Sequence, residues 1–227
     1  MKITWLGQAG LLFDNGKTKI MADPYLSNSV EKVEPNNFRR IPVKEEFFKI
    51  EPDFMIFTHD HLDHYDPETA PMFLCEGRKH MTVLSPASVY KKARALGGGH
   101  NYVLFDRGTE WTDAGFRFKA VMASHSDPCA IGVIIEDFSE GKTYYITGDT
   151  LYNSRIFEEI PENIDIVFLP INGVGNNMNE TDAVRFFRAC GARRAVPYHV
   201  GMFDSKVPDI FDDKNKIILE VYKEIEV

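Results

Sequence analysis

Thr58-His59-Asp60-His61-Leu62-Asp63-His64 follows a short apolar run and is the most informative segment of this 227-residue sequence. Three imidazoles and a carboxylate are costly to bring so close together unless a metal ion binds them. At the end of an extended segment, residues two apart point the same way, so His59 and His61 can bind one ion. Asp63 and His64, where the chain turns, can face a second ion. This thiolate-free donor set suits Zn, Mn, Fe, Co or Ni and argues against Mg or Ca.

Three further donors lie at the ends of predicted strands. His125 follows an alternating apolar stretch, Asp149 follows a glycine at the end of an aromatic run, and His199 ends a short apolar run. Strand-end loops are where rigid scaffolds usually place functional residues. We expect these donors to complete the metal site. His80 and His100 lie in polar or glycine-rich connections and are expected to be solvated instead.

The order of apolar runs and turn residues predicts an α/β protein of one domain over residues 1–227, with two packed β-sheets and helices outside. Neither an internal repeat nor a low-complexity linker divides the chain. We expect strands at 2–6, 11–13, 17–21, 53–57, 82–84, 143–147, 164–169 and 194–197, and three or four more between 101 and 135. We expect helices to begin near Asp66, Ser85, Ser154 and Asn179.

Composition restricts the class of protein. A formal net charge of −8 and the lack of a Lys/Arg-rich run oppose a nucleic-acid partner, since phosphate contacts need clustered basic residues. Apolar runs fall short of the roughly 18–20 residues that a membrane span requires, so we expect no membrane partner. Three widely spaced cysteines fit free thiols in a reducing cytoplasm better than disulfides.

The order of these donors along the chain resembles that of a known protein superfamily. Asp23, the segment 58–64, His125, Asp149 and His199 together resemble the five motifs of the metallo-β-lactamase superfamily of metal-dependent hydrolases. The resemblance implies that superfamily's four-layer αββα sandwich. Finer matches, at Trp5-Leu6-Gly7, Asn179-Glu180-Thr181-Asp182-Ala183 and Pro197-Tyr198-His199, are similar to the branch that contains L-ascorbate-6-phosphate lactonase. This chain lacks the long terminal extensions of that lactonase.

The resemblance implies two bound divalent ions and a role for each donor. The first ion is expected at His59, His61 and His125, and the second at Asp63, His64 and His199, with Asp149 bridging them. A hydroxide shared by two such ions would attack the substrate, because each metal lowers the pKa of bound water. Asp63 would also orient that hydroxide or take its proton. Asp23 and Asp60 are candidates for hydrogen bonds that fix the imidazole tautomers, with a solvent-facing Asp60 as the alternative.

Candidate substrate contacts are less specific. Arg39 and Arg40 lie in a long polar segment that is typical of a loop covering a site, and could meet a substrate phosphate. A pair of solvated surface arginines is the alternative. The other candidates are Tyr152, Asn172, Asn176 and Tyr198.

The favoured function is hydrolysis of a small cytoplasmic metabolite, with a lactone of a phosphorylated sugar acid as the expected substrate. One alternative is a phosphodiesterase acting on cyclic nucleotides or small phosphate esters, since two metal ions also serve in-line displacement. An alternative of another class is a non-catalytic, metal-binding regulatory protein. Relatives in the lactonase-like branch form oligomers, so the resemblance also implies a homo-oligomer.

Overall fold

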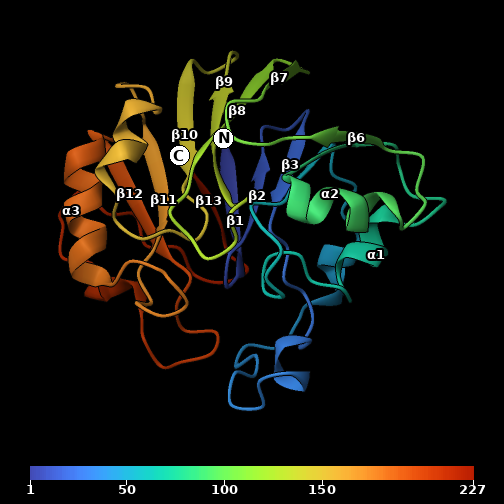
Figure 1. The fold of residues 1–227 in the computed structure, drawn as a ribbon, viewed down its shortest axis with the longest axis horizontal. Coiled ribbons are helices and arrows are strands. Elements are labelled where there is room, and N and C mark those ends of the chain that lie inside the picture. Colours follow the sequence, from blue (N-terminus) through green and yellow to red (C-terminus); the bar gives the residue numbers. More distant parts are fainter. The chain divides into compact units, whose positions relative to one another are not determined.

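The computed structural model describes residues 1–227, which form two compact units. The first unit contains Met1–Leu104, Gly201–Ser205 and Glu220–Val227, and the second contains Phe105–Val200 and Lys206–Leu219. Each unit holds one β-sheet (Figure 1). The single domain expected over residues 1–227 stays a prediction.

The sheet of the first unit has seven strands in the order β13-β1-β2-β3-β4-β5-β6. Their bounds are β1 Lys2–Gly7, β2 Gly10–Asp14, β3 Lys19–Ala22, β4 Phe54–Ile56, β5 Thr82–Ser85, β6 Asn101–Leu104 and β13 Glu224–Glu226. Strands β13, β1, β2 and β3 pair antiparallel, whereas β3, β4, β5 and β6 pair parallel. The hairpin between β2 and β3 turns at Gly16, whose φ of 84° suits a residue without a side chain.

Short helices accompany the parallel half of this sheet. They are α1 Ala70–Leu74 and α2 Ala87–Arg94, with the 3₁₀ turns η1 Val30–Lys32 and η2 Glu45–Lys49. Helix α2 packs against β5 and β6 (Figure 1). The core of the unit combines strand residues such as Met55 and Val83 with Phe73 of α1 and Val89 of α2, all of which are fully buried. Burial on both faces explains why β4 is apolar at every position.

The second unit has a six-stranded sheet in the order β12-β11-β10-β9-β8-β7. The strands are β7 Glu110–Asp113, β8 Phe116–Met122, β9 Ile131–Asp137, β10 Lys142–Ile146, β11 Ile166–Pro170 and β12 Arg194–Tyr198, and the helical elements are η3 Ser154–Glu158, α3 Glu180–Cys190 and η4 Pro208–Ile210. Helix α3 packs against β11 with Phe186 and Phe187 in the core. Asn179 caps it as predicted, because its side chain accepts a hydrogen bond from the Asp182 N–H.

Three predicted helix starts need correction. Ser85 does not cap α2, because Pro86 is the N-cap residue and no side chain bonds to the first turn. The helix expected at Asp66 begins only at Ala70, since the Asp66 side chain accepts hydrogen bonds from Glu68 and Thr69 in a preceding turn. The helix expected at Ser154 is the 3₁₀ turn η3.

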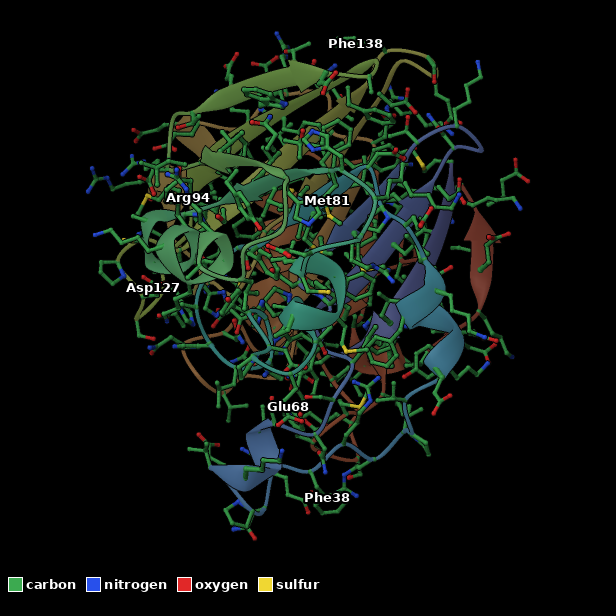
Figure 2. The ribbon with its side chains drawn as sticks, turned by 90° about the vertical axis from the view of Figure 1, so that its right-hand side faces the viewer. Phe38, Glu68, Met81, Arg94, Asp127 and Phe138 are labelled. Carbon is green, nitrogen blue, oxygen red and sulfur yellow. The ribbon has the colours of Figure 1, made fainter.

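The long connection between β3 and β4 is mostly irregular, as its polar composition predicts. It contains η1 and η2, and Phe38 lies on its outer surface with 41% of its area exposed (Figure 2). Elsewhere in the chain, helices are short, and none has the length and apolar character needed to cross a membrane.

Candidate functional site

The parallel strands of the first unit bring Asp23 and the histidine cluster to one edge of the sheet. Asp23 follows β3 and the cluster follows β4, and parallel neighbours end at the same edge. The backbone N–H of Asp23 donates to the carbonyl oxygen of Ile56 at 2.9 Å, which holds the two strand ends together. Asp23 has a φ of 42°, an uncommon conformation for a residue with a side chain, and it is fully buried.

A hydrogen-bonded chain links Asp23 to two imidazoles. Its carboxylate accepts from the Thr58 N–H at 2.8 Å, from the Thr58 hydroxyl at 2.6 Å and from His64 Nδ1 at 2.8 Å. Because the Thr58 hydroxyl proton points to Asp23, its oxygen accepts from His59 Nδ1 at 3.1 Å. Both imidazoles therefore carry a proton on Nδ1, and their lone pairs lie on Nε2. This is the tautomer that a ligand binding through Nε2 requires.

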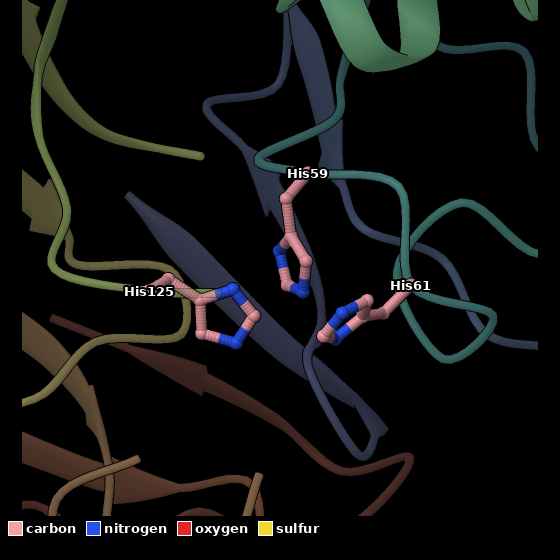
Figure 3. Close-up of side chains that lie close together, drawn as sticks. All are labelled: His59, His61 and His125. Carbon is pink, nitrogen blue, oxygen red and sulfur yellow. The ribbon is translucent and has the colours of Figure 1, made fainter. Parts of the chain in front are cut away.

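The remaining donors of the first unit lie beside these two rings. The His59 and His61 rings have centroids 4.7 Å apart in an edge-to-face arrangement and lie next to each other in Figure 3. Asp63 Oδ2 lies 4.0 Å from His64 Nε2. Tyr65 follows directly, and burial raises the pKa of its hydroxyl to about 12, so the residue stays neutral near pH 7.

Strand direction in the second unit also explains its donors. Strands β8 and β10 both pair antiparallel with β9, so they run in the same direction, and β10, β11 and β12 pair parallel. The residues after β8, β10 and β12 consequently lie at one edge of the sheet. Those residues include His125, Asp149 and His199.

Asp149 lies close to each of the two histidines. His199 Nε2 lies 3.1 Å from Asp149 Oδ1, and His125 Nε2 lies 4.0 Å from Asp149 Oδ2. Neighbouring ligands of one tetrahedral zinc ion are roughly 3.4 Å apart, given metal–ligand bonds of about 2.1 Å. His199 has a φ of 61°, so the backbone turns sharply where β12 presents this side chain.

Two contacts to the donors were not predicted from the sequence. Gln8, in the two-residue turn between β1 and β2, donates from Nε2 to Asp63 Oδ2 at 2.9 Å. Asn177 donates from Nδ2 to Asp149 Oδ2 at 2.7 Å. Gln8 could have been noticed as a buried amide in an apolar run, whereas the polar stretch around Asn177 offers no such signal.

The two predicted tautomer-fixing residues have different surroundings. Asp23 contacts the His64 ring as described above. Asp60 forms an ion pair with Lys92 at 2.7 Å, and its side chain is 32% exposed. The surroundings of Asp60 thus favour the surface alternative.

The arginines of the long connection also differ from each other. Arg39 donates to the carbonyl oxygens of Tyr25, Leu6 and Ile41 and to the Tyr222 hydroxyl. These contacts stay within the first unit and hold segments distant in sequence, so they favour a structural role over a substrate contact. Arg40 is exposed, and its guanidinium lies over the Phe38 ring.

The other candidate substrate contacts lie in the second unit. Asn172 is buried, and its side-chain amide lies 3.1 Å from His199 Nδ1, so it contacts a metal-ligand candidate. Tyr198 is fully buried, as expected of a packing residue. Tyr152 packs on Phe157 and Phe186 with Arg185 over its ring. Asn176 is exposed and has a φ of 65°.

Comparison with known proteins identifies the family. Residues 18–200 match the model of the beta-lactamase superfamily domain, so the chain belongs to this superfamily. A UPF0173 metal-dependent hydrolase of Ligilactobacillus salivarius is 28% identical over 220 residues, with 93% of this chain and 90% of the relative covered.

Solved structures share the fold. The metallo-β-lactamase fold protein YhfI of Bacillus subtilis matches with a TM-score of 0.71 and 17% identity over 99% of both chains. Igni18, a metallo hydrolase of Ignicoccus hospitalis, matches with a TM-score of 0.70 and 19% identity over 99% of this chain and 97% of its own. The predicted fold class, an α/β fold of the metallo-β-lactamase type, is confirmed.

Proposed function

We propose that the chain is a metal-dependent hydrolase that binds two divalent transition-metal ions, Zn, Mn or Fe. The single observation that carries the proposal is the chain of hydrogen bonds from Asp23, which places the lone pairs of His59 and His64 on Nε2. A solvated histidine cluster needs no such arrangement. The relatives named metal-dependent hydrolases support the same activity.

The proposed ligands are those that the resemblance implies: His59, His61 and His125 for the first ion, and Asp63, His64 and His199 for the second, with Asp149 as the bridging carboxylate. When bound, such ions lower the pKa of water toward neutrality and polarise a substrate oxygen.

The chain's own residues supply orientation and proton transfer. Asp63 is the proposed catalytic residue, which accepts a proton from the attacking water, and Gln8 holds its carboxylate through Oδ2. Asp23 holds the His64 ring, and Thr58 holds the His59 ring. The exposed Arg40 and Asn176 remain the proposed substrate contacts.

The proposed substrate is a small cytoplasmic metabolite, with a lactone of a phosphorylated sugar acid favoured by the resemblance to the lactonase-like branch. The proposal includes neither a nucleic-acid nor a membrane partner, and it includes assembly into a homo-oligomer. The net charge of −8 supports the exclusion of nucleic acid, because a polyanion would be repelled.

Elemental analysis of protein purified without added metal tests metal binding, and a substrate panel under the metal found tests activity. The panel contains sugar-acid lactones, with and without a phosphate, and bis-p-nitrophenyl phosphate. His61→Ala should lose turnover by at least about 100-fold, as expected for removal of a metal ligand. His80→Ala is the matched control, since His80 is exposed and contacts the carbonyl oxygen of Gly99.

The outcomes separate the three functions. Lactone opening that is lost on chelation and in His61→Ala supports the proposal. Cleavage of the phosphodiester while every lactone stays intact would establish the phosphodiesterase instead. Stoichiometric metal without turnover of any panel member would favour the regulatory protein.

A further inference from the structure

One loop of the second unit, Asn172–Asn177, contacts all three donors of that unit. The Asn172 amide lies against His199 Nδ1, the Gly175 carbonyl oxygen lies 3.0 Å from His125 Nε2, and Asn177 donates to Asp149. The loop therefore influences the arrangement of three donors that lie up to 74 positions apart in the sequence.

Asn177 makes the most specific of these contacts. Its side chain is buried, and Oδ1 accepts a hydrogen bond from the Thr150 N–H at 3.1 Å while Nδ2 donates to Asp149 Oδ2 at 2.7 Å. The orientation of the amide is unambiguous, because a backbone N–H can only donate and so must meet the amide oxygen. The amide nitrogen therefore faces the carboxylate, as a donor to an ionised acceptor should.

One of these bonds reaches the Asp149 carboxylate, and the other holds the backbone of the next residue, Thr150. Asn177 binds one carboxylate oxygen of Asp149, and the other oxygen lies 3.1 Å from His199 Nε2. Met178 adds a third link, because its N–H donates to the carbonyl oxygen of Thr150 at 3.0 Å. The turn that carries Asp149 is thus held by Asn177 and by Met178, the residue that follows the loop.

The loop itself is preformed. An antiparallel bridge joins Asn172 to Asn179, and the Gly173 N–H donates to the Met178 carbonyl oxygen at 3.1 Å. Gly173, Gly175 and Asn176 all have φ between 65° and 72°, so three left-handed residues shape its reversal. A Cβ on Gly173 would lie 3.1 Å from Asn179 Cβ, so a side chain at this position would crowd Asn179.

We propose that Asn177 is a positioning residue that orients the Asp149 carboxylate for metal binding. This inference rests on the proposed function, since it assumes that Asp149 is a metal ligand. Asn177 acts through Asp149 and takes no part in the chemistry itself. Loss of such an outer contact typically weakens metal affinity about 10- to 100-fold.

Asn177→Asp is the discriminating variant. The new side chain keeps an oxygen that can accept from the Thr150 N–H. The amide nitrogen that donated to Asp149 becomes a carboxylate oxygen, so two carboxylates then face each other. Asn179→Asp is the matched control, because Asn179 caps α3 through its side-chain oxygen and an aspartate caps equally well. Asn177→Ser removes the amide without adding charge, and it carries the same expectation if Asn177→Asp does not fold.

Three quantities are measured for each protein: the thermal midpoint without metal, the affinity for Zn²⁺ by competition with a chromogenic chelator, and the visible spectrum of the Co²⁺-loaded protein. We expect Asn177→Asp and Asn177→Ser to bind Zn²⁺ about 10- to 100-fold more weakly than wild type and to alter the Co²⁺ spectrum. The Asn179→Asp control should match wild type in Zn²⁺ affinity and in its Co²⁺ spectrum.

Failure of this inference is distinct from failure of the proposed function. Wild-type affinity and an unchanged Co²⁺ spectrum in both Asn177 variants would overturn the positioning role while leaving the hydrolase intact. An equal loss in Asn179→Asp would also overturn it, because the effect would then belong to the loop as a whole. A wild-type protein that binds neither metal would overturn both proposals.

Discussion

Asp23→Asn tests whether the buried carboxylate sets the tautomers of the histidine cluster. The Thr58 N–H holds one oxygen of residue 23, so the new amide nitrogen must take the place of the other. That position now accepts from the Thr58 hydroxyl at 2.6 Å and from His64 Nδ1 at 2.8 Å. An amide nitrogen there can only donate, so His64 must move its proton to Nε2, where a metal would bind.

The size of the effect follows from these contacts. Hydrogen bonds to a charged group contribute roughly 1.5–3 kcal/mol each, and the Thr58 hydroxyl can turn to accept from the new amide. We therefore expect the free energy of unfolding of the metal-free protein to fall by about 3 kcal/mol, the equivalent of one to two such bonds. Metal affinity should fall about 10- to 100-fold as a separate effect.

Urea unfolding of the metal-free protein and a chelator competition titration measure the two effects. Asp53→Asn is the control, because Asp53 also accepts from a backbone N–H at 2.8 Å and pairs with Lys79, yet it contacts no imidazole in these bonds. The free energy of unfolding of Asp53→Asn should fall by only about 1 kcal/mol, and its metal affinity should not change. Metal affinity of Asp23→Asn within twofold of wild type would refute the tautomer argument, whatever happened to stability.

Other parts of the first unit yield three further predictions. Gly98→Ala should lower the free energy of unfolding by about 1–3 kcal/mol in a urea titration, because its Cβ would lie 2.2 Å from a backbone oxygen. Gly99→Ala is the control, since its Cβ would meet nothing within 4 Å, and equal stability of the two variants would contradict the prediction. Arg39→Lys should lower the thermal midpoint, since one ammonium cannot satisfy three carbonyl oxygens and a hydroxyl; a midpoint equal to wild type would exclude the structural role. Burial raises the pKa of Tyr25 and Tyr65 to about 12, so these hydroxyls ionise at lower pH in the unfolded chain than in the folded protein. The stability that they contribute below pH 10 should therefore be lost as pH rises toward 12. Urea midpoints that are equal at pH 9 and pH 11 would disprove that coupling.

Local patterns were sufficient where a residue's role depends on its immediate neighbours. The cap of α3 by Asn179 was predicted, and strands β1 to β5 and β10 to β12 were predicted to within two residues at each end, because these features depend on a few adjacent residues. Ser85 was wrong as the cap of α2, because the N-cap position is occupied by Pro86. At Asp66, a side-chain hydrogen bond to the following backbone delayed the helix to Ala70.

The metal donors stay a prediction from the sequence, which rests on histidines at spacing two and on isolated donors after apolar runs, a pattern typical of a metal site. Fold class followed from the same pattern and from the family resemblance, and the comparisons confirmed both. The lactonase-like substrate stays a prediction.

The amino-acid sequence by itself determined the metal-binding chemistry and the succession of strands and helices, because both follow from residue type and short-range spacing. Tertiary structure alone decided which polar groups hold those donors. Asp23 meets His64 across 41 positions, Asn177 meets Asp149 across 28, and Arg39 meets Tyr222 across 183. No local pattern encodes such pairs, because they form only when parallel strands and rigid loops bring distant backbone segments within hydrogen-bonding distance.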